Sequence, residues 1–120
     1  MTARTGNKRG WGSSGAIQTG RFIRDYLLRV GEAYPYRVWK ELKAARESHG
    51  LKVCSPLGMY KYFKMLKDMG VLEPTGRVEV SERKSPIALR RYYRVIRGKE
   101  NSPVWDDVQG HYRSWKESRT

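Results

Sequence analysis

The stretch Ser55–Leu72, SPLGMYKYFKMLKDMGVL, decides the fold. Ser55 is a favourable N-cap, Pro56 suits the first helical turn because it lacks an N–H, and Gly70 suits the C-terminal stop. At about 100° per residue, the apolar side chains and the Lys/Tyr side chains separate onto two faces. This predicts a helix with one face in a core and one basic face outward. The apolar arc holds Met59, Tyr62, Phe63, Leu66 and Met69, and the opposite arc holds Leu57, Tyr60, Lys61, Lys64 and Asp68.

The charge of the whole chain points to an acidic partner. The 120 residues carry a formal net charge of +13 and a pI near 10.2. The length fits a single domain. A balance this basic is typical of proteins that bind a polyanion, most often nucleic acid. An inert basic surface is the alternative that composition leaves open.

Several classes of protein do not fit the sequence. Cys54 is the single cysteine, which excludes an internal disulfide and a Cys-rich zinc site. The chain has no apolar run of about 18 residues and no apolar signal-peptide core, so we expect a cytoplasmic, nucleoid-associated protein. His49 and His111 lie far apart, and no catalytic or metal-ligand spacing is present. We therefore expect no enzyme activity, no cofactor and no metal.

The segments before the central helix predict an arm and two helices. Residues 1–18, rich in Gly, Ser and basic residues, predict a flexible arm. Its Arg4, Lys8 and Arg9 either contact a nucleic-acid backbone or belong to a leader without function. Helical spacing predicts one helix over 19–30, capped by Thr19, and another from Pro35 to about Ser48. Their predicted buried stripes are Phe22, Ile23, Tyr26, Leu27 and Val30, then Val38, Trp39, Leu42 and Ala45; Lys40, Lys43 and Arg46 are predicted to be solvated or near phosphate.

After Leu72 the apolar period changes to alternation. Val78 and Val80 alternate with Arg77 and Glu79. Tyr93 and Val95, which we expect in the core, alternate with Tyr92, Arg94 and Ile96. The pattern predicts a β-hairpin with a first turn near Pro74-Thr75-Gly76. Residues 83–99 contain seven basic side chains and no acidic one, so the hairpin is strongly basic.

The last segment predicts a further helix beginning at Ser102-Pro103. Trp105, Val108, Tyr112 and Trp115 recur every three or four residues on one stripe. Asp106 and Asp107 fall in its first turn, where the helix dipole favours acidic residues. The stripe either covers the domain or pairs with a second copy. We favour a homodimer contact, because small helical DNA-binding proteins often read two half-sites.

The order helix, helix, helix, basic hairpin resembles the winged helix-turn-helix superfamily. The segment MYKYFKMLKDMGVLEP is similar to its recognition helix, and RRYYRVIRG is similar to the returning wing strand of PadR-like and related archaeal regulators. FIRDYLL and YRVWKELKAA are similar to its first two helices. The resemblance implies an α+β fold with a three-helix bundle and a wing over 19–98, plus a helical extension at 99–120. The connector before Ser55 is longer, and the wing tip less Gly-rich, than in most members.

The resemblance also implies a function and a site. It implies a DNA-binding transcription regulator that docks helix 55–69 in the major groove and the wing, 81–97, on the backbone or minor groove. The predicted contacts are Ser55, Tyr60, Lys61 and Lys64 on the helix and Arg83, Lys84, Arg90, Arg91 and Arg94 on the wing. One alternative is an RNA-binding structural component of a ribonucleoprotein that stacks bases on exposed Trp11, Tyr60 and Tyr92. The other is a protein-interaction module that uses the C-terminal Trp stripe.

Overall fold

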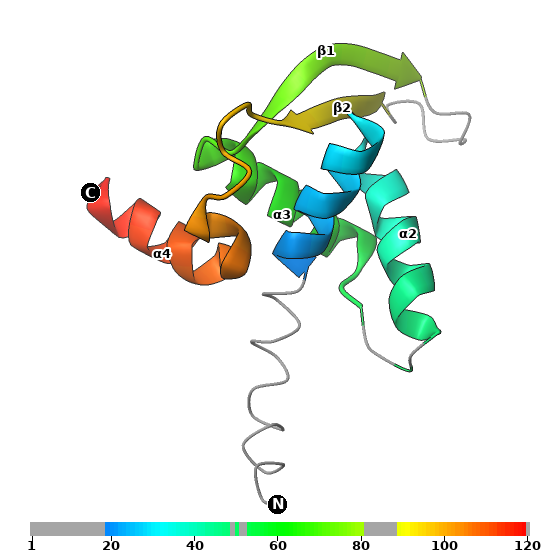
Figure 1. The fold of residues 1–120 in the computed structure, drawn as a ribbon, viewed down its shortest axis with the longest axis horizontal. Helices are drawn as coiled ribbons and strands as arrows, with labels where there is room; N and C mark the ends of the chain where they lie inside the picture. The colour runs from blue at the N-terminus through cyan, green and yellow to red at the C-terminus, as the bar shows by residue number, and fades with distance from the viewer. Residues whose placement is uncertain (1–18, 49, 51–52, 81–88, 120) are drawn as a thin grey trace, which may run out of the picture.

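The chain folds into helices covered on one side by an antiparallel hairpin (Figure 1). The computed structural model describes residues 19–48, 50, 53–80 and 89–119. The predicted α+β class is confirmed, and so are the helices expected near 19–30, 35–48 and 55–69. In chain order the elements are a first helix at residues 19–30, α2 (Pro35–Glu47), α3 (Pro56–Asp68), β1 (Leu72–Val80), β2 (Leu89–Val95), a short 3-10 helix η1 (Pro103–Asp106) and α4 (Val108–Ser118).

Both ends of α3 are fixed by local hydrogen bonds, as its sequence predicts. The Ser55 hydroxyl accepts a hydrogen bond from the Gly58 N–H at 3.0 Å. At the other end, Gly70 has φ +80°, a conformation that glycine adopts at little cost. The Gly70 N–H then donates to the Lys67 carbonyl and the Val71 N–H to the Leu66 carbonyl, each at 3.1 Å. These two hydrogen bonds close the helix, and the chain then turns into β1.

The apolar face of α3 lies at the centre of a single core. Phe63 packs edge-to-face on Tyr93 of β2, with ring centroids 5.3 Å apart. Tyr93 and Val95 lie against this core, as expected. Every helix and the base of the hairpin contribute to the core. Its largest fully buried apolar side chains are Ile23, Leu27, Val38, Leu42, Met59, Phe63, Leu66, Leu72, Trp105 and Val108.

Within its described residues, the hairpin differs from the prediction at the expected first turn. No turn occurs at Pro74-Thr75-Gly76, because β1 runs through these residues and the register with β2 shifts between Pro74 and Val78. Gly76, at φ +93°, accommodates the irregularity. The Thr75 hydroxyl donates to Glu32 Oε1 at 2.7 Å, which ties the irregular segment to the chain just after the first helix.

The segment between the first helix and α2 adds a short edge to the sheet. Ala33 and Tyr93 exchange two backbone hydrogen bonds, of 3.2 and 2.9 Å. β2 therefore has β1 on one side and Ala33 on the other.

The C-terminal segment forms two helices and not the single predicted one. Ser102 caps η1 and Asp107 caps α4 through the Gly110 N–H at 3.2 Å. The break at Asp107 lets Trp105 enter the core, where its indole N–H donates to the Lys99 carbonyl at 2.8 Å. An unbroken helix would not provide this turn toward the core.

The first two helices also differ from the prediction in detail. Thr19 is already helical, so it does not cap the first helix. Arg46, predicted to be solvated or near phosphate, is buried and donates to the Thr19 hydroxyl at 3.1 Å. Its long side chain takes the inward position predicted for Ala45, which is exposed. Val30 is exposed too, since it ends the helix beyond the core.

Candidate nucleic-acid interface

The outward side of α3 is an open surface of lysine, tyrosine and leucine. Leu57 is 64% exposed and Tyr60 46% exposed. Within the part of the chain that the structure describes, Lys61 and Lys67 form no ion pair. Their ammonium groups are therefore available to an anionic ligand. We call this surface the outer face of α3; it comprises Leu57, Tyr60, Lys61, Lys64 and Lys67.

Lys64 is in a different state from its neighbours. Its Nζ lies 2.7 Å from Asp68 Oδ2, and the same oxygen accepts a hydrogen bond from the Tyr112 hydroxyl at 3.0 Å. Burial alone would raise the pKa of Asp68, but the bonds from Lys64 and Tyr112 outweigh it and lower that pKa. Asp68 thus stays ionised and compensates part of the Lys64 charge.

Ser55, predicted to face the major groove, is exposed but already bonded within the protein. Its hydroxyl oxygen accepts the Gly58 N–H as the N-cap of α3. Ser55 therefore caps α3, and a ligand that bound its hydroxyl would share it with the Gly58 N–H.

Within the described residues, some basic side chains of the hairpin contact an acidic side chain or an aromatic ring, and others do not. Arg94 Nε lies 2.8 Å from Glu73 Oε2, and the Arg90 guanidinium lies 4.9 Å from the centre of the Tyr34 ring. Arg91 is exposed and has no ion-pair partner among the described residues. Of these three predicted contacts, Arg91 is the most available to phosphate. The predicted contacts Arg83, Lys84, Arg4, Lys8 and Arg9 lie outside the described residues.

A charged cluster that joins the hairpin to Glu32 was not predicted from the sequence. Arg77 lies 3.1 Å from Glu32 and 2.9 Å from Glu79, and its guanidinium stacks 4.2 Å over Tyr92. Hydrogen bonds from Thr75 and then Arg77 lower the pKa of Glu32. Arg77 and Glu79 are two residues apart on β1 and therefore lie on one face, which was the sequence signal for their ion pair. The role of Glu32 depends on the tertiary fold.

Tyr92 is buried, which corrects its predicted role as an exposed stacking platform. It is 5% exposed, and its hydroxyl donates to Glu79 Oε1 at 2.7 Å. Its ring packs edge-to-face on Tyr34 and carries Arg77 above it. Of the three aromatic residues proposed for base stacking, Tyr60 remains exposed and Trp11 lies outside the described residues.

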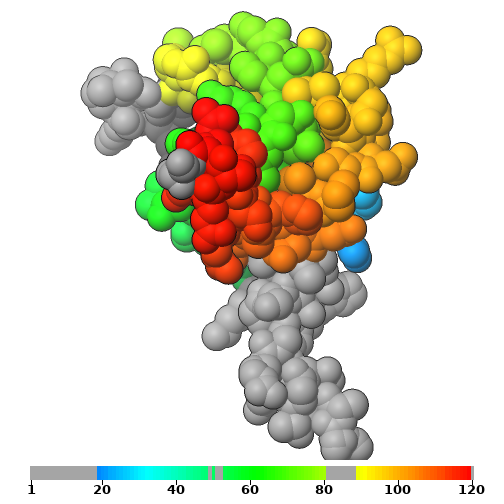
Figure 2. Space-filling view, turned by 90° about the vertical axis from the view of Figure 1, so that its left-hand side faces the viewer, coloured from blue at the N-terminus to red at the C-terminus, as the bar shows by residue number. Residues whose placement is uncertain are grey.

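Two of the four residues of the C-terminal stripe are not available for the predicted dimer contact. Trp105 and Val108 are fully buried in the core of their own chain, so they cannot contact a second copy. Tyr112 and Trp115 are half-buried and stack with ring centroids 5.3 Å apart. Figure 2 shows α4 in red against the green residues of α3. The stripe thus attaches α4 to the domain.

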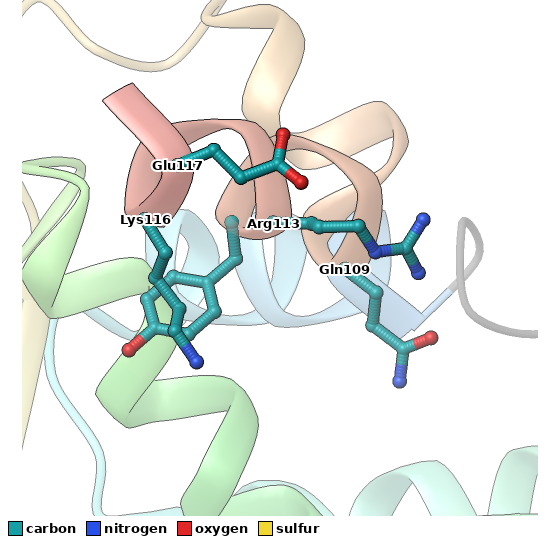
Figure 3. Close-up of a pocket in the computed structure, with 5 residues that line it drawn as sticks. Gln109, Arg113, Lys116 and Glu117 are labelled. Carbon is teal, nitrogen blue, oxygen red and sulfur yellow. The ribbon is translucent and has the colours of Figure 1, made fainter. Parts of the chain in front are cut away.

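The described residues include a surface hollow on α4 and the Cys54 thiol. A surface hollow of about 290 Å³ is lined by α4 alone, and Figure 3 shows that its labelled side chains do not converge on one point. Burial raises the pKa of the Cys54 thiol, which disfavours the nucleophilic thiolate. In the described ranges no His, Cys, Asp and Glu side chains group as metal ligands, and no helix has the length and apolar character to cross a membrane.

Comparison with known proteins supplies no family. The chain matches no protein-family model, and no curated protein matches it in sequence.

Proposed function

We propose that this protein binds double-stranded DNA as a winged-helix transcription regulator, with α3 as the recognition helix. The observation that carries the proposal is the outer face of α3. Lys61 and Lys67 are exposed and unpaired among the described residues, on a helix whose opposite face is held in the core. A rigid helix with free cations on one side suits the major groove, which is wide enough to admit an α-helix.

The arrangement of the other elements supports a winged-helix assignment. A helix, a short sheet edge at Ala33, two further helices and a hairpin follow one another along the chain. In the winged-helix layout the hairpin lies beside the recognition helix and touches the flanking backbone. Arg91, exposed on β2, is the described wing residue best suited to that contact.

The chemistry of the face favours affinity over sequence selectivity. Lysine can donate to guanine O6 and N7, whereas the Tyr60 hydroxyl suits a phosphate oxygen. The face has no Arg or Asn, which make the best bidentate base contacts. Much of the binding free energy would therefore come from phosphate contacts and depend on salt.

A paired substitution tests the proposal directly. We expect K61Q/K67Q to weaken binding to a random-sequence duplex several-fold in a fluorescence-anisotropy titration, with an unchanged melting temperature. The matched control is R29Q/R37Q, which removes two exposed charges from the first helix and α2, over the Tyr26 ring. Equal affinities for wild type, K61Q/K67Q and the control would refute the assignment of α3.

RNA binding, as part of a ribonucleoprotein, is the second candidate. It is favoured by Tyr60, whose exposed ring on the same face could stack on an unpaired base. Competition between duplex DNA, single-stranded DNA and structured RNA at one salt concentration separates the two. If RNA displaces labelled duplex at lower concentration, and Y60A removes that preference, RNA is the ligand. Binding to none of them would favour a protein partner.

A further inference from the structure

We propose that the C-terminal end of α4 carries a second phosphate-binding surface, which extends the α3 interface along the same nucleic acid. The surface consists of Lys116 and Arg119, and we call it the basic end of α4. This inference rests on the proposed function and adds to it a contact outside the three-helix bundle and hairpin.

Hydrogen bonds place the basic end of α4 beside the outer face of α3. The Tyr112 hydroxyl donates to Asp68 Oδ2 at 3.0 Å, and that oxygen also binds Lys64 Nζ. The Lys116 ammonium lies 5.5 Å from the centre of the Tyr112 ring. Lys64 and Lys116 are therefore both adjacent to Tyr112. A ligand that lies along α3 and reaches Lys64 is close to α4.

The local charge balance is positive. Asp68 is the acidic side chain bonded to this junction, whereas Lys64, Lys116 and Arg119 are all exposed cations. Glu117, the acidic residue of α4, lines the same hollow as Lys116. The three cations still exceed the two carboxylates, Asp68 and Glu117, by one charge. The surplus of positive charge is complementary to a phosphate backbone.

The aromatic pair at this end favours phosphate over stacked bases. The Tyr112 and Trp115 rings stack on each other with an interplanar angle of 16°, and the Arg119 guanidinium lies 4.7 Å from the centre of the Trp115 ring. Since the rings already contact each other and the two cations, a ligand meets mainly ammonium and guanidinium groups. The helix dipole also favours cations here, but it does not account for the position of Lys116 over Tyr112, the ring whose hydroxyl bonds to α3.

The test is the salt dependence of duplex binding by the full chain. We expect K116Q/R119Q to lower the slope of log K against log salt by roughly two units, at about 0.9 per lost phosphate contact, equally for all sequences. The control R29Q/R37Q removes the same charge from cations that also lie over a ring, and its slope should match wild type. The exchange K116R/R119K keeps both charges and should retain the wild-type slope.

The outcomes separate this inference from the proposed function. If wild type does not bind the duplex, both are wrong. If K61Q/K67Q weakens binding while K116Q/R119Q keeps the wild-type slope, only the α4 surface is wrong. A slope equally reduced in R29Q/R37Q would mean that total charge, and not this surface, controls binding, which also overturns the inference. Loss of self-association by K116Q/R119Q at an unchanged slope would overturn it in favour of a protein interface.

Discussion

Asp68 Oδ2 lies 2.7 Å from Lys64 Nζ, one turn earlier on α3. The Lys64 side chain is 68% exposed, but that of Asp68 is 20% exposed because Tyr112 of α4 covers it. The hydrogen bond to Asp68 is also the main reason why the pKa of Lys64 lies above its ordinary value. Asp68 thus links α4 to the outer face of α3 and at the same time compensates one of its cations.

The first prediction concerns the two opposite effects of removing this carboxylate charge. We expect D68N to lower the melting temperature by a few degrees, because the bonds to Lys64 and Tyr112 weaken. We expect it to raise duplex affinity, because Lys64 is released and the interface gains one net positive charge. Anisotropy titrations and thermal unfolding measure the two effects separately.

The control for D68N is D106N. Asp106 forms an exposed ion pair with Arg21 at 2.8 Å, away from α3. D106N changes the net charge of the protein by the same amount as D68N. If D106N raises the affinity as much as D68N, the effect is one of total charge and Lys64 has no special position at the interface.

The sequence predicts α3 well because its determinants are local. The N-cap at Ser55, the glycine at Gly70 and the helical spacing of apolar residues all lie within the stretch itself. Its exposed side was correctly predicted at Leu57, Tyr60, Lys61 and Lys64 for the same reason. The ion pair of Lys64 with Asp68 was not predicted, since the burial of Asp68 depends on α4.

The features that the sequence did not predict depend on contacts between distant residues. Thr75 bonds Glu32 across 43 positions, and this contact holds β1 where a turn was expected. Trp105 was assigned to a dimer surface because an amphipathic stripe does not reveal which surface it covers. Arg46 carries a charge yet is buried, since Thr19 accepts its hydrogen bond across 27 positions.

A second prediction separates the two roles proposed for Ser55. We expect S55A to destabilise the protein by about 1 kcal/mol in urea unfolding, because the Gly58 N–H loses its acceptor. Duplex affinity per folded molecule should change little. S114A is the control: Ser114 is exposed on α4 and caps nothing, so its effect should stay within about 0.5 kcal/mol. A large loss of affinity with unchanged stability would instead make Ser55 a ligand contact.

The third prediction is a loss of stability in acid. A hydrogen bond from Tyr92 and then one from Arg77 lower the pKa of Glu79, and bonds from Thr75 and Arg77 lower that of Glu32. A lowered folded-state pKa stabilises the fold above the unfolded-state value, about 4.3 for Glu, and this contribution disappears as the pH falls through the folded-state pKa. E79Q should therefore be less stable than wild type at pH 7 and converge with it in acid. Parallel curves of unfolding free energy against pH would contradict this role of Glu79.

The fourth prediction concerns the close packing of the first helix on the C-terminal segment. In an open helix, Gly to Ala stabilises by about 0.5–1 kcal/mol. At Gly20 a Cβ would lie 2.5 Å from the Trp105 carbonyl oxygen and 2.6 Å from Val108 Cγ2. We expect G20A to cost about 1–3 kcal/mol, because neither group can move without disturbing the core. The control A44G, at an exposed position of α2, measures the effect of helix propensity alone. A melting temperature for G20A at or above that of wild type would exclude the close contact.

The last prediction distinguishes the arginines of the wing. Arg91 is exposed opposite Val78 and has no acidic partner among the described residues, whereas Arg94 is compensated by Glu73 at 2.8 Å. If the wing lies on the phosphate backbone, R91Q should lower the salt slope of duplex binding by about 0.9. R94Q removes the same charge, but from a guanidinium that is already paired, so its slope should stay closer to wild type. Salt titrations of the two single variants decide between these cases. Equal slopes for R91Q and R94Q would show that the wing acts through net charge alone, without a contact at Arg91.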